Sequence, residues 1–218
     1  MSIATIPELT TAPPPFAALT ERQPAWEVAL LFPNQGAWSK YDYLDLPGNQ
    51  LVEFDNGRIE VLPMPSIRHQ NIAMNIAVPL RVHVQMHELG TVLCAPMPVL
   101  VAPLKFREPD VVFTRSAAPE ESDGDKYLDS AELVIEIISD GPANRKRDLI
   151  DKRADYAAAG IEEYWVIDPD PQQVIVFRLQ AGEYVELGTF GILDVVRSIA
   201  VSGFEIPVVK IFANCVPP

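Results

Sequence analysis

The sequence predicts one α/β domain (α+β, with a mixed sheet). Three observations lead to this prediction: a turn between two apolar runs at 51–62, a long amphipathic segment at 66–88, and an apolar–charged–apolar succession at 133–168. Short apolar runs bounded by turn residues are typical of strands, whereas apolar residues three and four apart are typical of helices. Strands and helices that alternate along the chain indicate a mixed α/β architecture.

Length and charge limit the possible functions. The chain has 218 residues, enough for one sizeable core, and we expect residues 25–218 to form a single domain. Residues 1–24 are rich in proline and lack periodicity, which predicts a flexible arm. The net charge of −13 argues against a large DNA-binding footprint, although it leaves room for a local basic patch.

Cysteine content and hydropathy predict a cytoplasmic protein. Cys94 and Cys215 are far apart and have no metal-ligand spacing, so a disulfide framework is not indicated. The first twenty residues lack a basic stretch followed by an apolar core, so we expect no secretory signal. The most apolar long run, 89–104, is interrupted by prolines and is too short to span a membrane.

The first half of the chain contains clear local signals. Ser39 precedes a short apolar segment and predicts a capped helix that ends at Pro47. Asn56-Gly57 between two apolar runs is a strong hairpin signal. The segment 66–88 predicts a long helix, with Pro79 expected to kink it and Gly90 to end it.

The second half predicts a strand–helix–strand unit with further strands around it. The helix at 144–159 ends at Gly160, a residue suited to a left-handed cap. A polar, acidic segment at 115–131 is expected to be a loop or lid. The expected strands are 91–101, 111–114, 133–138, 163–167, 174–179, 183–187 and 193–201, with a last strand or turn at 205–212.

Two carboxylates on these strands are candidates for metal binding. Asp110 precedes one expected strand and Glu136 lies inside the next, among apolar residues where an unpaired charge is costly. If the strands pair, about 4.8 Å apart, both carboxylates can bind one divalent ion such as Mg²⁺, which suits phosphodiester hydrolysis. The alternative is that Asp110 caps a turn and Glu136 faces solvent or pairs with a core cation.

The helix at 144–159 carries a third candidate. Arg145, Asp148, Lys152 and Tyr156 are spaced so that they share one helix face. Lys152 can therefore extend towards the Glu136 strand, where it would orient the attacking water or stabilise charge on a phosphate. The alternative is a solvated charged face, with Leu149 and the alanines of the helix on its apolar side.

The histidines do not predict a zinc site. His83 and His87 are one helical turn apart, but the segment lacks the glutamate of the metalloprotease signature. His69 lies about 27 Å from His87 along an unbroken helix, so the three cannot share one ion there.

Four segments together carry a resemblance to a known family. They are VEFDNGRIEVLPMPSIRHQNIA (52–73), PDVVF (109–113), LVIEIIS (133–139) and RKRDLIDKRADYAAAGIEEYWVIDP (145–169). The chain resembles the Uma-type restriction endonuclease family, a former domain of unknown function common in cyanobacteria, within the PD-(D/E)XK nuclease superfamily. The resemblance covers roughly residues 40–205 and implies a restriction endonuclease-like core.

The resemblance implies roles for individual residues. Asp110 matches the PD aspartate and Glu136 the acidic residue of the (D/E)XK motif, while Ile138 stands where the motif has lysine. Lys152 on the following helix matches the position to which the lysine has moved in this family. Glu53 resembles a recurrent glutamate that would complete the metal shell. His69 matches a recurrent histidine, a possible accessory residue with no role assigned.

The resemblance implies a Mg²⁺- or Mn²⁺-dependent endonuclease that acts on DNA, with a homodimer as the expected assembly. Catalysis would rest on Asp110, Glu136 and Lys152, and a local positive patch that includes Arg145 and Arg147 would bind substrate. The alternative function is a weakly active or inactive interaction or regulatory protein that keeps the nuclease fold. The net charge of −13 and the displaced lysine favour that alternative.

Overall fold

The computed structural model describes residues 33–46, 51–115, 126–139 and 141–215, apart from the side chains of residues 142 and 143. The chain divides into two compact units, Met1–Asn34 and Gln35–Pro218, and only residues 33 and 34 of the first unit are described. The predicted arm at 1–24 and residues 116–125 of the predicted loop lie outside the described residues.

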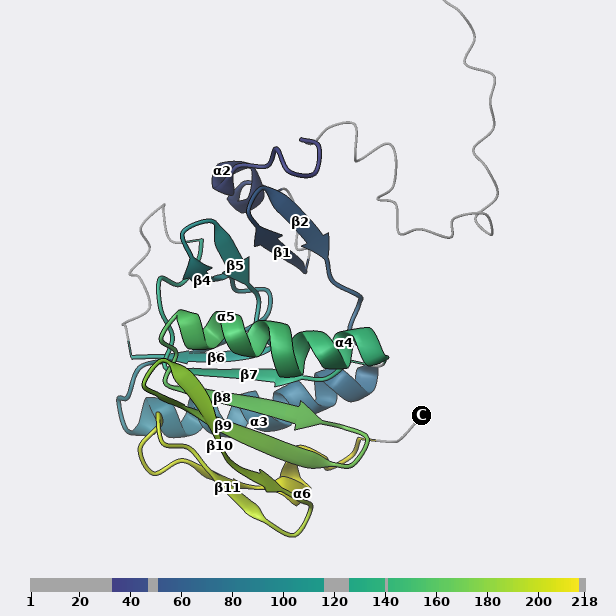
Figure 1. The fold of residues 1–218 in the computed structure, drawn as a ribbon. Coiled ribbons are helices and arrows are strands. Elements are labelled where there is room, and N and C mark those ends of the chain that lie inside the picture. The colour runs from purple at the N-terminus through teal and green to yellow at the C-terminus, as the bar shows by residue number, and fades with distance from the viewer. Residues whose placement is uncertain (1–32, 47–50, 116–125, 140, 216–218) are drawn as a thin grey trace, which may run out of the picture. The chain divides into compact units, whose positions relative to one another are not determined.

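In the described part of Gln35–Pro218, helices separate runs of consecutive strands, as Figure 1 shows. The elements are α2 (Lys40–Leu44), β1 (Val52–Asp55), β2 (Arg58–Val61), α3 (Ile67–Met86), β3 (Thr91–Cys94), β4 (Val99–Ala102), β5 (Lys105–Arg107), β6 (Val111–Thr114), β7 (Leu133–Ile137), α4 (Pro142–Lys146), the π-helical turn η2 (Arg147–Asp151), α5 (Lys152–Ala158), β8 (Glu163–Asp168), β9 (Gln173–Gln180), β10 (Glu183–Phe190), β11 (Val195–Arg197), β12 (Glu205–Pro207) and α6 (Val208–Ile211).

The central sheet has six strands in the order β10-β9-β8-β7-β6-β3. β7 and β8 are parallel, and the segment α4–η2–α5 connects them. The other neighbouring strands are antiparallel. This mixed sheet with flanking helices confirms the predicted fold class.

The two faces of the central sheet are covered by different helices (Figure 1). Ile135 of β7 packs in the cluster that contains Ile76 and Leu80 of α3. Val134, one residue earlier, packs in a second cluster with Tyr156 of α5. Because side chains alternate along a strand, Glu136 shares the face of Val134 and points towards α5.

The hairpin predicted at Asn56-Gly57 is confirmed. Both turn residues have positive φ, 47° for Asn56 and 81° for Gly57, as the tight turn between β1 and β2 requires. A Cβ at Gly57 would lie only 2.8 Å from the carbonyl oxygen of Gly36, so glycine is also needed for close packing. The hairpin joins a second sheet with the order β2-β1-β5-β4.

The single strand predicted at 91–101 is wrong. The chain instead forms β3 in the central sheet and β4 in the second sheet, with Pro96 and Pro98 between them. Proline cannot donate a ladder hydrogen bond, so the strand stops there and the chain changes sheets. β5, which follows β4, was not predicted.

The long helix predicted at 66–88 is confirmed as α3. The Ser66 hydroxyl accepts a hydrogen bond from the His69 amide at the start of the helix, and Pro79 lies within it. The left-handed residue after the helix is Glu88, with φ 53°, two residues before the expected stop at Gly90. Neither α3 nor another helix in the described part of the chain is long and apolar enough to cross a membrane.

The last strand pair differs from the prediction. The expected strand at 193–201 is reduced to β11, and the tail forms β12, which pairs with β11, followed by α6. Residues 198–200 leave β11 because they bind a carboxylate from another strand. That carboxylate belongs to Glu163 of β8, which is fully buried.

Glu163 fastens the C-terminal segment to the central sheet. Its Oε2 accepts hydrogen bonds from the Ser198 hydroxyl at 2.6 Å and from the amides of Ile199 at 3.0 Å and Ala200 at 2.9 Å. Its Oε1 accepts a hydrogen bond from Trp165 Nε1 at 2.8 Å. A buried carboxylate with so many donors replaces its lost hydration with protein hydrogen bonds.

We expect Glu163→Ala to lower the free energy of unfolding by about 2 to 4 kcal/mol, because it leaves buried donors without an acceptor. Urea denaturation followed by tryptophan fluorescence measures this change. The matched control is Glu162→Ala, which removes a half-exposed side chain paired with Arg115 at 3.1 Å and should change stability by less than about 1 kcal/mol. Equal effects of the two substitutions would contradict the role of Glu163.

Candidate active site

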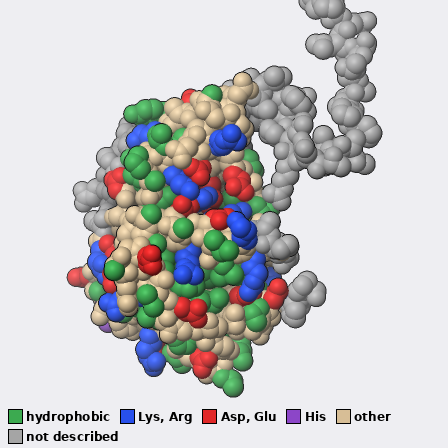
Figure 2. All heavy atoms as spheres, viewed as in Figure 1, with side chains coloured by type: hydrophobic (Ala, Val, Ile, Leu, Met, Phe, Trp, Pro, Cys, Tyr) green, Lys and Arg blue, Asp and Glu red, His purple; other side chains and the backbone are tan. Residues whose placement is uncertain are grey.

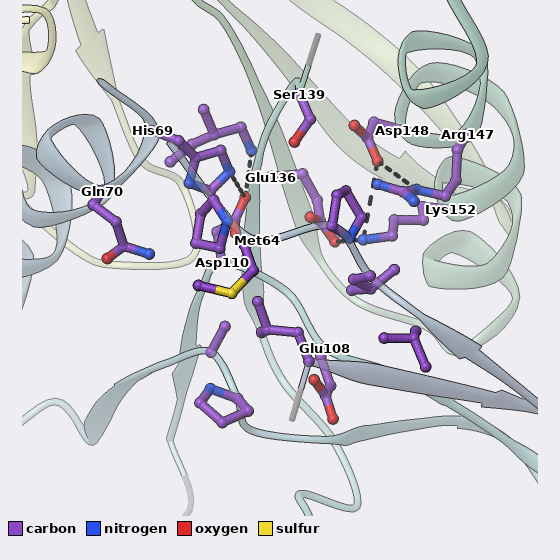
Figure 3. A pocket seen from close by; sticks show the side chains of 18 residues that line it. Met64, His69, Gln70, Glu108, Asp110, Glu136, Ser139, Arg147, Asp148 and Lys152 are labelled. Carbon is purple, nitrogen blue, oxygen red and sulfur yellow. Dashed lines mark hydrogen bonds and ion pairs between the residues drawn. The ribbon is translucent and has the colours of Figure 1, made fainter. Parts of the chain in front are cut away.

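Asp110 and Glu136 lie side by side, as the sequence predicts for paired strands. β6 and β7 are antiparallel, and Val111 lies opposite Ile135. Continuing this register by one residue places Asp110 opposite Glu136. Both side chains line one pocket of about 440 Å³ (Figure 3).

Asp110 is held by two elements. Its Oδ2 accepts a hydrogen bond from the Ile137 amide at 2.7 Å and lies 3.2 Å from His69 Nε2. Burial disfavours the charged imidazole, but the hydrogen bond and charge of Asp110 outweigh it and raise the pKa of His69. His69, which had no assigned role, therefore contacts the first of the predicted site carboxylates.

Glu136 is buried and held by α5. Its Oε1 lies 2.8 Å from Lys152 Nζ and accepts a hydrogen bond from the Tyr156 hydroxyl at 2.5 Å. Burial raises the pKa of Glu136; Lys152 opposes the rise, and the negative charges of Asp110 and Asp148 add to it. Glu136 thus pairs with a core cation, Lys152, as the alternative to a metal ligand predicted, and it also lines the pocket.

The charged face of the helix points inward, so the interpretation as a solvated face is wrong. Asp148, Lys152 and Tyr156 are buried, whereas Ile150, on the expected apolar side, is 58% exposed. Asp148 lies in the π-helical turn η2 and Lys152 directly follows it; at the end of this turn the Lys152 amide donates a hydrogen bond to the Arg147 carbonyl, five residues earlier. Such π-helical turns are frequent at functional sites.

Tyr164 contacts this π-helical turn from the central sheet. Its hydroxyl, on β8, donates a hydrogen bond to the Asp148 carbonyl at 2.8 Å. The ring stacks against Phe177 of β9 and meets the Tyr156 ring edge-on. The sheet therefore fixes the part of the helix that carries Asp148 and Lys152.

Lys152 is the centre of a buried ion network. Its Nζ lies 2.8 Å from Glu136, 3.0 Å from Glu53 and 3.9 Å from Asp148. Burial opposes a charged lysine, but these carboxylates outweigh it and raise the pKa of Lys152. The lysine is therefore held in its charged form.

Glu53 has a different position from the one expected of a metal ligand. It is 1% exposed and does not line the pocket. Its carboxylate lies 3.0 Å from Lys152 and 2.5 Å from Arg107, a residue that sequence reasoning missed. Arg107 in turn binds Asp155 at 2.6 Å. These contacts give Glu53 the position of a residue that orients Lys152.

The structure separates the two arginines expected to bind substrate. Arg145 lies 2.5 Å from the buried carboxylate of Asp168, so its guanidinium is already engaged there. Arg147 lines the pocket and lies 3.4 Å from Asp148 and 3.8 Å from Glu60. Both arginines of the expected basic patch thus have acidic neighbours, and of the two it is Arg147 that lines the pocket.

The donor set of the pocket suits a hard divalent cation. Asp110 and Glu136 both contribute carboxylate oxygens to the pocket lining. In the described part of the chain no three His, Cys, Asp or Glu side chains converge as a metal-ligand group. Asp110 and Glu136 nevertheless match the one or two carboxylates by which Mg²⁺ is usually held, the remaining ligands being water and substrate phosphate.

His83 and His87 belong to a different region. Their rings lie 4.5 Å apart, and His83 Nε2 is 2.9 Å from the Ser202 carbonyl. His83 therefore fastens α3 to the loop before β12.

Comparison with known proteins identifies the fold and the family of the chain. A solved structure from Anabaena variabilis, described as a putative nuclease belonging to DUF820, is 22% identical and has a TM-score of 0.63 to this chain; the match covers 79% of this chain and 96% of that one. It establishes the fold as one shared with that protein. No curated protein is significantly similar. The profile of the Uma2 family, described as putative restriction endonuclease, matches residues 38–209, which include every residue of the site, and the chain therefore belongs to the Uma2 family.

Proposed function

We propose that this protein is a Mg²⁺- or Mn²⁺-dependent endonuclease that hydrolyses phosphodiester bonds of DNA. One observation carries the proposal: Asp110, directly before β6, and Glu136, on the neighbouring strand β7, line the same pocket, and Lys152 is bound to Glu136. The family is described as putative restriction endonuclease, and the fold is shared with a protein described as a putative nuclease, which supports the proposal. The homodimer expected from the sequence stays a prediction.

In this proposal Asp110 and Glu136 hold the ion. When bound, the ion would polarise a phosphoryl oxygen and lower the pKa of a water molecule. Asp110 is kept in place by the Ile137 amide and His69, and Glu136 by Lys152 and Tyr156. Such fixed carboxylates need little reorganisation when substrate arrives.

Lys152 and Arg147 supply the positive charge. Lys152 keeps Glu136 oriented and lines the pocket, where its charge would stabilise negative charge that develops on the phosphate. Arg147 is the better candidate for contacting a phosphate oxygen, because its acidic neighbours are 3.4 and 3.8 Å away and its guanidinium is not held in a closer ion pair. Arg145 is left out of the proposal.

We expect Asp110→Asn to reduce metal-dependent nicking of supercoiled plasmid by about 100-fold or more, because it removes a ligand charge and keeps the shape of the side chain. Electrophoresis of plasmid incubated with Mg²⁺ or Mn²⁺ measures the rate. The control is Asp129→Asn at an exposed position, which should cut like the wild type. If the wild-type protein leaves plasmid intact with both metals, the alternative of an inactive nuclease fold is favoured.

A thermal-shift titration tests the metal site without a substrate. An ion that binds only the folded protein at a hundredfold excess over its Kd adds about 2.7 kcal/mol to the free energy of unfolding. Mn²⁺ should therefore raise the Tm of the wild type and of Asp129→Asn, and this rise should be lost in Asp110→Asn. An unchanged rise in Asp110→Asn would place the ion elsewhere.

Lys152 has a structural role that can be measured separately. We expect Lys152→Met to lower the free energy of unfolding by about 3 to 5 kcal/mol, because it leaves buried carboxylates without their cation. The matched control is Lys146→Met, whose side chain is 64% exposed and pairs with Asp151, and which should change stability by less than about 1 kcal/mol. Urea denaturation compares the two; a small effect of Lys152→Met would contradict the burial of this charge.

A further inference from the structure

The pocket has a second wall with a different chemistry. The segment that connects β2 to α3 contributes a run of apolar residues to the lining, next to the carboxylates (Figure 3). Met64 in this run is 91% exposed and Val61 at the end of β2 is 56% exposed. Large apolar side chains that line a polar pocket and face water are not explained by core packing, and they indicate a binding surface.

This wall is presented on a stiffened segment. At one end of the segment, the Leu62 amide donates a hydrogen bond to the Leu51 carbonyl, next to the last residue pair of the hairpin. At the other end, four residues later, Ser66 caps α3. Pro63 and Pro65 flank Met64 and restrict the backbone on both sides of it. The backbone that carries Met64 therefore loses little conformational freedom when a ligand packs on it, and the ordering cost falls on the Met64 side chain.

The pocket also contains a free amide. Gln70, in the first turns of α3, lines the pocket; its backbone N–H donates to the Ser66 carbonyl, whereas its side-chain amide makes no hydrogen bond to the described residues. An amide offers both donors and an acceptor, the combination that pairs with the edge of a nucleobase. The volume of about 440 Å³ is within the range of small-molecule sites.

Several cations among the described residues already have carboxylate partners. Lys105 lies 2.7 Å from Asp155, Arg145 lies 2.5 Å from Asp168, and Lys146 lies 3.2 Å from Asp151. On the face drawn in Figure 2, positive and negative side chains are interspersed. Binding to intact duplex depends strongly on phosphate contacts by Lys and Arg, and among the described residues the pocket lining contains only Lys152 and Arg147.

We propose that the pocket takes an unpaired nucleotide, whose base packs on Met64 and Leu62 while Gln70 meets its edge. This inference rests on the proposed function, because it places the adjoining phosphate at Asp110 and Glu136. The preferred substrate is then nucleic acid with unpaired nucleotides, such as a bulge, a flap or a single strand. In a paired duplex the base must first be unstacked and flipped, and that cost reduces the affinity.

Fluorescence anisotropy of labelled DNA measures binding by the full-length protein and tests the inference. The assay contains Ca²⁺ in place of Mg²⁺ or Mn²⁺, so that binding is measured separately from nicking. The probes are a labelled 20-base-pair DNA duplex and the same duplex with one unpaired nucleotide. We expect the wild type to bind the second probe at least about tenfold more tightly, in line with the contribution of one stacked base. Met64→Ser should remove most of this preference, because it deletes the apolar surface and leaves an exposed position that does not contribute to the core.

The matched control is Met86→Ser, which also changes a largely exposed methionine, 74% exposed, but at the end of α3 and away from the pocket lining. It should keep the wild-type preference. A local readout comes from 2-aminopurine at the unpaired position, whose emission should change when the wild type binds and change less with Met64→Ser.

Equal affinity for the two probes, or a preference that survives Met64→Ser, overturns the inference. Plasmid nicking that depends on Asp110, found together with either of these results, leaves the proposed function standing. Absence of both binding and nicking overturns the proposed function and the inference with it.

Discussion

The buried charge of Lys152 is the interaction on which the site depends. Its ammonium contacts Glu136 of the central sheet, Glu53 of the hairpin and Asp148 of the π-helical turn. Removing one member of such a buried network leaves an uncompensated charge, which is strongly destabilising. The lysine thus joins three separate parts of the fold through the same group that orients Glu136.

Arg107 extends this network towards the surface. It binds Glu53 on one side and Asp155 of α5 on the other, and Lys105 also binds Asp155. Burial would raise the pKa of Glu53, but Lys152 and Arg107 lower it below its usual value. Lys105 and Arg107 are therefore engaged in stabilising the fold, and Lys152 and Arg147 are the cations that the described residues contribute to the pocket lining.

The pocket is lined by residues from several parts of the fold. Asp110 and Glu136 are fixed on the strands, and Arg147 reaches the pocket from the π-helical turn. The segment around Met64 reaches it from the hairpin and is apolar. The pocket thus has charged residues on one side and an apolar wall on the other, the two features on which the proposal of a nucleotide ligand rests.

Local patterns in the sequence determined the hairpin, α3 and the strands that carry Asp110 and Glu136, because turns, caps and periodicity depend on near neighbours. The spacing of Lys152 and its neighbours placed them on one helix face, but only the tertiary structure decided that this face is buried. No sequence pattern linked Glu53 to Arg107, 54 residues away, or His69 to Asp110. These contacts form only when the hairpin, α3 and the sheet pack together, since ion pairs between distant segments depend on packing in three dimensions and have no local signal.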